Sequence, residues 1–256
     1  MKTLSTLLLL FFMGSIPIKL ASQTAWDSLD KQALAFEKDK KYKEAIAIRE
    51  MLIQKDSISL TKEQLKNSQK LAILFEKDNQ KVKAEQTYLS LIAATLKTPY
   101  KDSVVYGNYM TELGVFYRKT EKYAEALYWQ KKAKNHLSRF SETHKAEYAS
   151  CLNNLAIVYF KLDNLEEGIA CVKKSLDFTD KKEANYSGKL NTLGMFYKKK
   201  GDYQAALKAY QEALKYDPKT EEIYLSHLNN IAIFHRVQPT TGRRSRKRWR
   251  CGRNES

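Results

Sequence analysis

The chain has 256 residues, 43% of them apolar, so it can bury a substantial core. Only nine glycines and four prolines interrupt it, which favours long helices joined by short turns. The formal net charge of +16 suits either a solvated lysine-rich surface or a nucleic-acid-binding patch, so the position of the charge matters more than its size. Three cysteines are too few, and odd in number, for a dense disulfide framework.

The first residues have the features of a secretory signal peptide. Lys2 precedes an apolar stretch that runs to Met13, and a break containing Gly and Pro is followed by small residues. We assign residues 1–22 to this signal, with cleavage near residues 21–23, and expect a secreted or periplasmic protein; a retained anchor is the alternative. No later segment reaches the roughly 18 continuous apolar residues of a membrane span.

A pattern of small and aromatic residues recurs through residues 26–236. Each copy has a small reference residue, an aromatic residue three positions later, a small residue 12 positions later and a small or apolar residue 19 positions later. Successive reference residues lie 38 to 42 positions apart. The five reference residues are Ala33, Ala72, Gly114, Ala156 and Gly194.

Each copy is predicted to be two helices joined by a turn. Apolar residues at helical spacing lie on both sides of a short polar segment: KDKK, KDNQ, KTEK, LDN and KKGD in the five copies. The small residues are expected where the two helices cross, since larger side chains would hold the backbones apart. TKEQ from Thr61 and DKKE from Asp180 are predicted capping boxes at helix starts.

The pattern fails after residue 236. A sixth unit begins with a reference at Ala232, but Arg244 stands at its twelfth position, inside an Arg-rich stretch. We therefore expect residues 237–256 to be a basic, disordered tail. Three origins stay open: an arm that binds nucleic acid or anionic lipid, a localisation signal, or a shifted reading frame or fusion junction that truncates a longer protein.

The repeated units resemble tetratricopeptide repeats. The stretches LGVFYRKTEKYAEALYWQKKA, LAIVYFKLDNLEEGIACVKKS and LGMFYKKKGDYQAALKAYQEALKYDP carry the resemblance. The family period is about 34 residues. The longer period found here is similar to that of kinesin light chains and bacterial envelope repeat proteins.

The resemblance implies an all-α fold, a right-handed superhelical solenoid of five helix pairs plus the first helix of a sixth. Its implied function is a noncatalytic protein–protein interaction scaffold, with a concave groove lined by the first helix of each pair.

Under this resemblance, the position three residues before each reference faces the groove. The last three units carry Asn153, Asn191 and Asn229 there. Because an amide side chain both donates and accepts hydrogen bonds, these residues are expected to hold the main chain of an extended peptide. Asparagines that meet only water are the alternative.

From the third unit onward, the positions four and five residues after the reference carry mostly basic side chains on the same face, with Phe160 as the exception and Arg236 in the sixth unit. We predict a basic part of the groove that recognises an acidic segment of a protein or peptide, although a solvated lysine face is the alternative. The predicted residues are Arg118, Lys119, Lys161, Lys198 and Lys199.

No catalytic or metal-binding motif is recognisable. The four histidines have no metal-site spacing, and CxxC, HExxH, phosphate-loop and nucleophile-elbow motifs are absent from the sequence. We expect no enzyme activity, metal, cofactor or small-molecule substrate. The first alternative function is the extracytoplasmic sensor region of a larger bacterial signalling protein, of histidine kinase or transcriptional regulator type. The second is polyanion binding through the tail, although nucleic acid is not the favoured partner.

Overall fold

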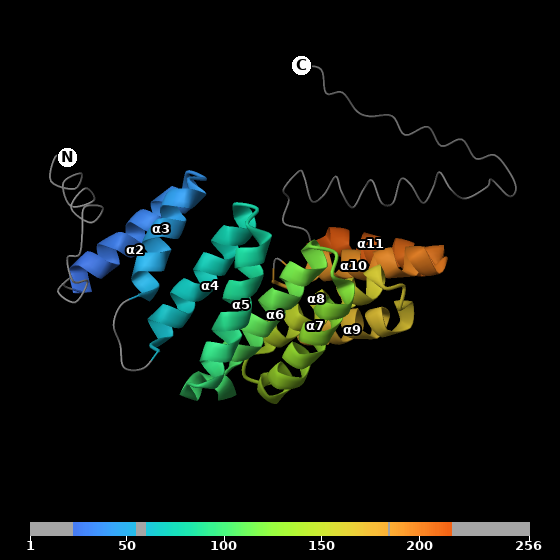
Figure 1. Cartoon of the computed structure of the whole chain (residues 1–256). Coiled ribbons are helices and arrows are strands. Elements are labelled where there is room, and N and C mark those ends of the chain that lie inside the picture. The colour runs from blue at the N-terminus through green and yellow to red at the C-terminus, as the bar shows by residue number, and fades with distance from the viewer. Residues whose placement is uncertain (1–22, 55–59, 184, 217–256) are drawn as a thin grey trace, which may run out of the picture. The chain divides into compact units, whose positions relative to one another are not determined.

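The computed structural model describes residues 23–54, 60–183 and 185–216, and these residues form helices and turns without a β-strand (Figure 1). The predicted all-α class is therefore confirmed for this part of the chain. The predicted signal peptide, the sixth unit and the basic tail lie outside the described residues. Among the described residues, no helix combines the length and apolar character needed to cross a bilayer.

The chain divides into two compact units, residues 1–178 and 179–256. In the first unit, the helices of the described residues form four successive pairs, and the second helix of each pair packs against the first helix of the next. These pairs are α2 (Gln23–Lys38) with α3 (Tyr42–Ile53), α4 (Lys62–Lys77) with α5 (Lys81–Leu96), α6 (Val104–Lys119) with α7 (Tyr123–Leu137), and α8 (Lys145–Lys161) with α9 (Leu165–Asp177).

Among the described residues of the first unit, two 3-10 helices lie in the connections between pairs: η2 (Pro99–Asp102) and η3 (Ser138–Phe140). The described part of the second unit contains one further pair, α10 (Tyr186–Lys200) and α11 (Tyr203–Tyr216). The predicted turns separate the two helices of each pair.

A single residue with left-handed backbone geometry makes each turn possible. These residues are Lys40, Asn79, Glu121, Asp163 and Gly201, each seven positions after its reference residue. At the third turn, the N–H of Lys122 donates to the carbonyl of Tyr117 at 2.9 Å, and the N–H of Glu121 donates to that of Arg118 at 3.2 Å. This is a Schellman motif, which satisfies two carbonyls that the end of a helix would leave unpaired. Tyr117, whose carbonyl accepts the hydrogen bond from Lys122, is the aromatic residue of the repeated pattern.

One predicted capping box is confirmed and the other is wrong. Gln64 N–H donates to the Thr61 hydroxyl at 3.2 Å, and the Thr61 N–H donates to the Gln64 side chain at 2.9 Å, so Thr61 caps α4. Asp180 does not begin a helix. Its carboxylate accepts from the Lys182 N–H at 2.9 Å in a turn, and α10 begins only at residue 186. Asp side chains satisfy turns as readily as helix starts, so the sequence pattern did not distinguish the two.

The small residues of the pattern are buried where each pair closes. Ala33, Ala72 and Ala156 expose none of their surface, and the two glycines at the other reference positions are also buried. The structure adds a second participant, the residue 16 positions after the reference. A Cβ added to Gly114 would lie 2.6 Å from the Gln130 amide, and one added to Gly194 would lie 2.4 Å from the Tyr210 ring.

The residue at this position belongs to the second helix of its pair. In three of the pairs it is a long side chain with at most 2% of its surface exposed: Arg49, Tyr88 and Tyr210. Gln130 is fully buried, and its amide donates to the Thr111 carbonyl of the first helix at 2.9 Å. A small reference residue thus makes room for a long side chain from the partner helix, which is why the two helices pack closely without a void.

Gly201, which follows the last residue of α10, and Gly188, within α10, provide a matched test of the turn geometry. Gly201 has a φ of 86°, which strains any residue with a Cβ, so Gly201→Ala should lower the free energy of unfolding by about 1 kcal/mol. Gly188 lies within α10 with nothing within 4 Å of an added Cβ, so Gly188→Ala should raise it by up to about 1 kcal/mol through helix propensity. Urea denaturation midpoints measure both changes. An unchanged or higher midpoint in Gly201→Ala would contradict the assigned turn.

Candidate functional site

A hollow of about 600 Å³ lies along the first helices of the second, third and fourth pairs, within the first unit. Apart from Tyr88 of α5, its lining residues come from α4, α6 and α8. They are Gln69, Ile73, Glu76, Lys77, Tyr88, Asn108, Thr111, Glu112, Val115, Lys119, Ala146, Glu147, Ser150 and Asn154.

The polar residues of this hollow occupy equivalent positions in successive helices. Asn108 and Ser150 lie six residues before their references, Gln69 and Thr111 lie three before, and Asn154 lies two before. Each of these side chains can donate and accept hydrogen bonds. The hollow is therefore lined, on the first helices of three consecutive pairs, by groups that suit a peptide main chain.

Glu112 is the most perturbed carboxyl group of the hollow. The Gln69 amide donates to its Oε1 at 2.6 Å, while its Oε2 is buried and has no hydrogen-bond partner. Burial raises the pKa of Glu112 to about 7, the Gln69 hydrogen bond opposes this rise, and the charge of Glu76 adds to it. The group is therefore about half protonated near neutral pH.

Glu112 should make stability fall as pH rises. Its pKa is higher in the folded state than in the unfolded state, so the folded protein holds this proton more tightly. The stability that this proton contributes is fully present below about pH 4.5 and is lost as pH rises through about 7. Glu112→Gln keeps the shape without the charge, so it should remove this dependence and stabilise the protein at pH 8 by on the order of 2 kcal/mol. Urea denaturation at a series of pH values provides the measurement. An equally steep pH dependence in the variant would contradict the assignment.

An ion pair between two first helices forms part of the lining of the hollow. Lys119 of α6 is paired with Glu76 of α4, and the hydroxyl of Tyr88 is hydrogen-bonded to the same carboxylate. Burial, with Glu112 and Glu76 nearby, raises the pKa of Tyr88 and keeps the phenol protonated. With Glu147 and Lys77 also present, the hollow is of mixed charge rather than uniformly basic.

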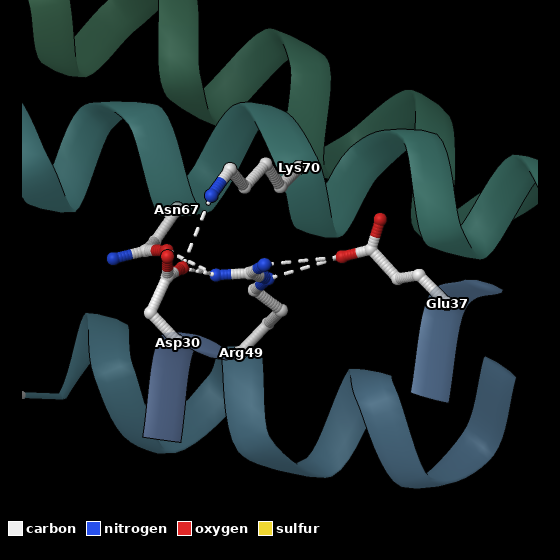
Figure 2. Close-up of polar contacts among 5 residues, drawn as sticks. All are labelled: Asp30, Glu37, Arg49, Asn67 and Lys70. Carbon is white, nitrogen blue, oxygen red and sulfur yellow. Dashed lines mark hydrogen bonds and ion pairs between the residues drawn. The ribbon is translucent and has the colours of Figure 1, made fainter. Parts of the chain in front are cut away.

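In the first pair, a buried arginine and its acidic partners form a cluster of polar contacts. Arg49 of α3 is fully buried, and its guanidinium lies between Asp30 and Asn67 on one side and Glu37 on the other (Figure 2). It donates to Asn67 at 2.8 Å and to Glu37 at 3.1 and 3.3 Å, and it is also paired with Asp30. Lys70 of α4 contacts the Asp30 carboxylate at 3.0 Å.

This cluster joins the first two pairs because its members come from α2, α3 and α4. Burial alone would raise the pKa of Asp30, but hydrogen bonds from Arg49 and Lys70 outweigh it and hold this pKa below the ordinary value. Asp30 and Glu37 lie three residues before and four after their reference, so acidic side chains in groove-facing positions are neutralised from within the protein.

Arg49→Met should lower the free energy of unfolding by roughly 3 kcal/mol, because it leaves the partly buried Glu37 carboxylate without a cation and leaves Asp30 with Lys70 alone. Arg139→Met is the matched control. Arg139 is 53% exposed and lies 3.8 Å from Asp102, so its loss should have an effect near zero. Thermal and urea denaturation compare the two. Similar effects in both variants would show that the buried cluster contributes no more than a surface ion pair.

The structure places the sequence-predicted site residues as follows. Asn153 lies partly buried on α8, with its Oδ1 buried and without a hydrogen-bond partner, and Asn191 lies partly buried on α10. Asn229 lies outside the described residues. The basic residues lie at the ends of first helices: Arg118 and Lys119 on α6, Lys161 on α8, and Lys198 and Lys199 on α10.

Of the predicted residues that the structure describes, only Lys119 lines the hollow. Sequence reasoning missed Gln69, Asn108, Glu112 and Asn154. Polar side chains recur six, three and two positions before the reference residues, and this recurrence was visible in the sequence. Only the position three residues before each reference was considered, and only where it held asparagine.

The described residues contain no group of three or more His, Cys, Asp or Glu side chains that could hold a metal ion. Cys151 and Cys171 are both free, and burial raises the pKa of the Cys151 thiol to about 12. A thiol with that pKa is a poor nucleophile at neutral pH.

Two family models, each described as a tetratricopeptide repeat, match residues 107–181 and 189–220. No curated protein sequence matches the chain.

Three solved structures illustrate what the chain resembles. BtubC (BKLC) from P. vanneervenii has a TM-score of 0.65 at 16% identity over 91% of this chain and 88% of its own. A putative kinesin light chain with nearly identical repeats from Podospora anserina has a TM-score of 0.67 at 14% identity, over 79% of this chain and 99% of its own. PilF of Pseudomonas aeruginosa has a TM-score of 0.59 at 14% identity over 85% and 94%. These likenesses confirm the predicted repeat solenoid.

Proposed function

We propose, from the premise that the chain is a tetratricopeptide repeat protein, that it is a noncatalytic scaffold whose first helices hold an extended segment of a partner protein. Proteins of this fold commonly bind other proteins, and the fold presents a continuous face made by one helix from each pair. The proposal assigns the binding to that face.

One observation carries the proposal: side chains of α4, α6 and α8 that can both donate and accept hydrogen bonds line one hollow at repeating positions. An extended peptide exposes alternating N–H and C=O groups and needs both donors and acceptors along its length. Recognition of its main chain leaves the sequence of the partner to be selected by neighbouring charged and apolar side chains. The residues concerned are Gln69, Asn108, Thr111, Ser150 and Asn154.

The asparagines predicted from the sequence belong to the same proposal. Asn153, Asn191 and Asn229 would extend main-chain recognition along the later repeats. Asn153 supports this role because its buried Oδ1 has no hydrogen-bond partner within the described part of the protein. A buried acceptor of this kind is costly until a donor reaches it.

The proposed place of action is outside the cytoplasm. Lys2 and the apolar stretch that follows support this compartment. The N-terminal sequence of the protein recovered from its native cells would show whether residues 1–22 are removed.

The groove is tested with a displayed library of short random peptides and the purified protein. Asn108→Ala combined with Asn154→Ala removes two amides from the hollow, and the selected peptides should then bind roughly thirtyfold more weakly, at about 1 kcal/mol for each lost hydrogen bond. Asn135→Ala is the matched control because Asn135 is exposed on α7, a second helix. Isothermal titration measures the affinities, and circular dichroism checks the helix content.

Peptides that bind the wild type and the double variant equally would contradict the assignment of the groove. A library that yields no binder would contradict the scaffold function itself. An equal loss in the Asn135→Ala control would place the binding surface elsewhere.

A further inference from the structure

Successive first helices in the first unit meet with the same alignment. The residue three before one reference contacts the residue two before the next: Asp30 contacts Lys70 at 3.0 Å, and Gln69 contacts Glu112 at 2.6 Å. Thr111 stands in the equivalent relation to Asn154, and both line the hollow. The alignment therefore continues from α4 through α6 to α8.

A second contact follows from this alignment near the other end of the helices. Glu76 lies four residues after its reference and is paired with Lys119, which lies five residues after the next one. The reference residues of the second, third and fourth repeats are equally spaced at 42 positions, and α6 packs directly against α8. The counterparts one repeat later are Arg118 and Lys161. The alignment thus brings two cations to the place where the preceding repeat has a Glu–Lys ion pair.

Neither cation is neutralised within the described part of the protein. The side chains of Arg118 and Lys161 make no ion pair or hydrogen bond there, and the Nε of Arg118 is buried without an acceptor. A buried guanidinium N–H without an acceptor costs free energy, and two adjacent cations repel each other. Lys119 differs from both because its charge is already paired with Glu76.

We infer that Arg118 and Lys161 form a carboxylate-binding site, which an aspartate or glutamate of the bound peptide occupies. This inference rests on the proposed peptide groove. Arg118 precedes Lys119, which lines the hollow, so the site adjoins the place where the peptide main chain lies. The guanidinium supplies paired N–H donors that match a carboxylate, and the lysine supplies a second charge. The incoming carboxylate takes the place that Glu76 holds in the preceding repeat.

The probe is a labelled glycine-serine peptide that carries a run of glutamates, compared with the same peptide carrying glutamines. The wild type should bind the glutamate peptide at least about tenfold more tightly, and added salt should reduce this preference. Arg118→Gln combined with Lys161→Gln should abolish the preference. Lys43→Gln combined with Arg139→Gln removes the same net charge from exposed positions outside the groove and should preserve it.

Arg118→Glu provides a second variant that the fold already accommodates, because it recreates the Glu–Lys pair of the preceding repeat. It should remain helical by circular dichroism, at least as stable as the wild type, and without preference for the glutamate peptide. A preference that survives in Arg118→Glu, or one that falls equally in the Lys43 and Arg139 variant, would overturn the site.

If the wild type binds neither peptide, the proposed groove is refuted. Amide-dependent binding to the groove without a preference for glutamate would refute only the carboxylate site.

Discussion

The close approach of two helices across a small reference residue is the constraint on which the rest of the structure depends. The left-handed residue of each turn reverses the chain within three residues or fewer, so the two helices must pack along their lengths. They can do so because the reference residue has little or no side chain. Any larger residue at Gly114 or Gly194 would collide with the side chain that crosses from the second helix.

The crossing side chain links this packing constraint to function. Tyr88 reaches from α5 to the hollow, Gln130 donates to a carbonyl of α6, and Arg49 reaches the carboxylates of α2. The second helix therefore determines part of the chemistry of a face formed by first helices. In the first pair it supplies a cation that neutralises Asp30 and Glu37.

Charge pairing then distinguishes the segments of that face. Acidic side chains of the first pair are satisfied by Arg49, and Glu76 is satisfied by Lys119. Glu112 has an amide partner and a pKa raised by burial, and Arg118 has no acidic partner within the described residues. Net charge is therefore a poor guide to the ligand, because several of the charges on this face are paired within the protein. The remaining unpaired groups are the ones that a ligand can satisfy.

The sequence by itself determined the helix pairs, their turns and the all-α class. Burial of small residues and the left-handed turn depend on contacts within one repeat, so they recur at a spacing that can be read along the chain. The capping role of Thr61 was predictable for the same reason.

Only the tertiary structure decided which polar residues are available to a partner. Lys119 and Arg118 are neighbours in sequence with the same charge, yet only Lys119 meets a carboxylate, which comes from a residue 43 positions away. The burial of Glu112 and the neutralisation of Asp30 likewise depend on side chains from other helices. Their charges are balanced across repeats, and a periodic pattern specifies the spacing of the repeats but not which side chains meet between them.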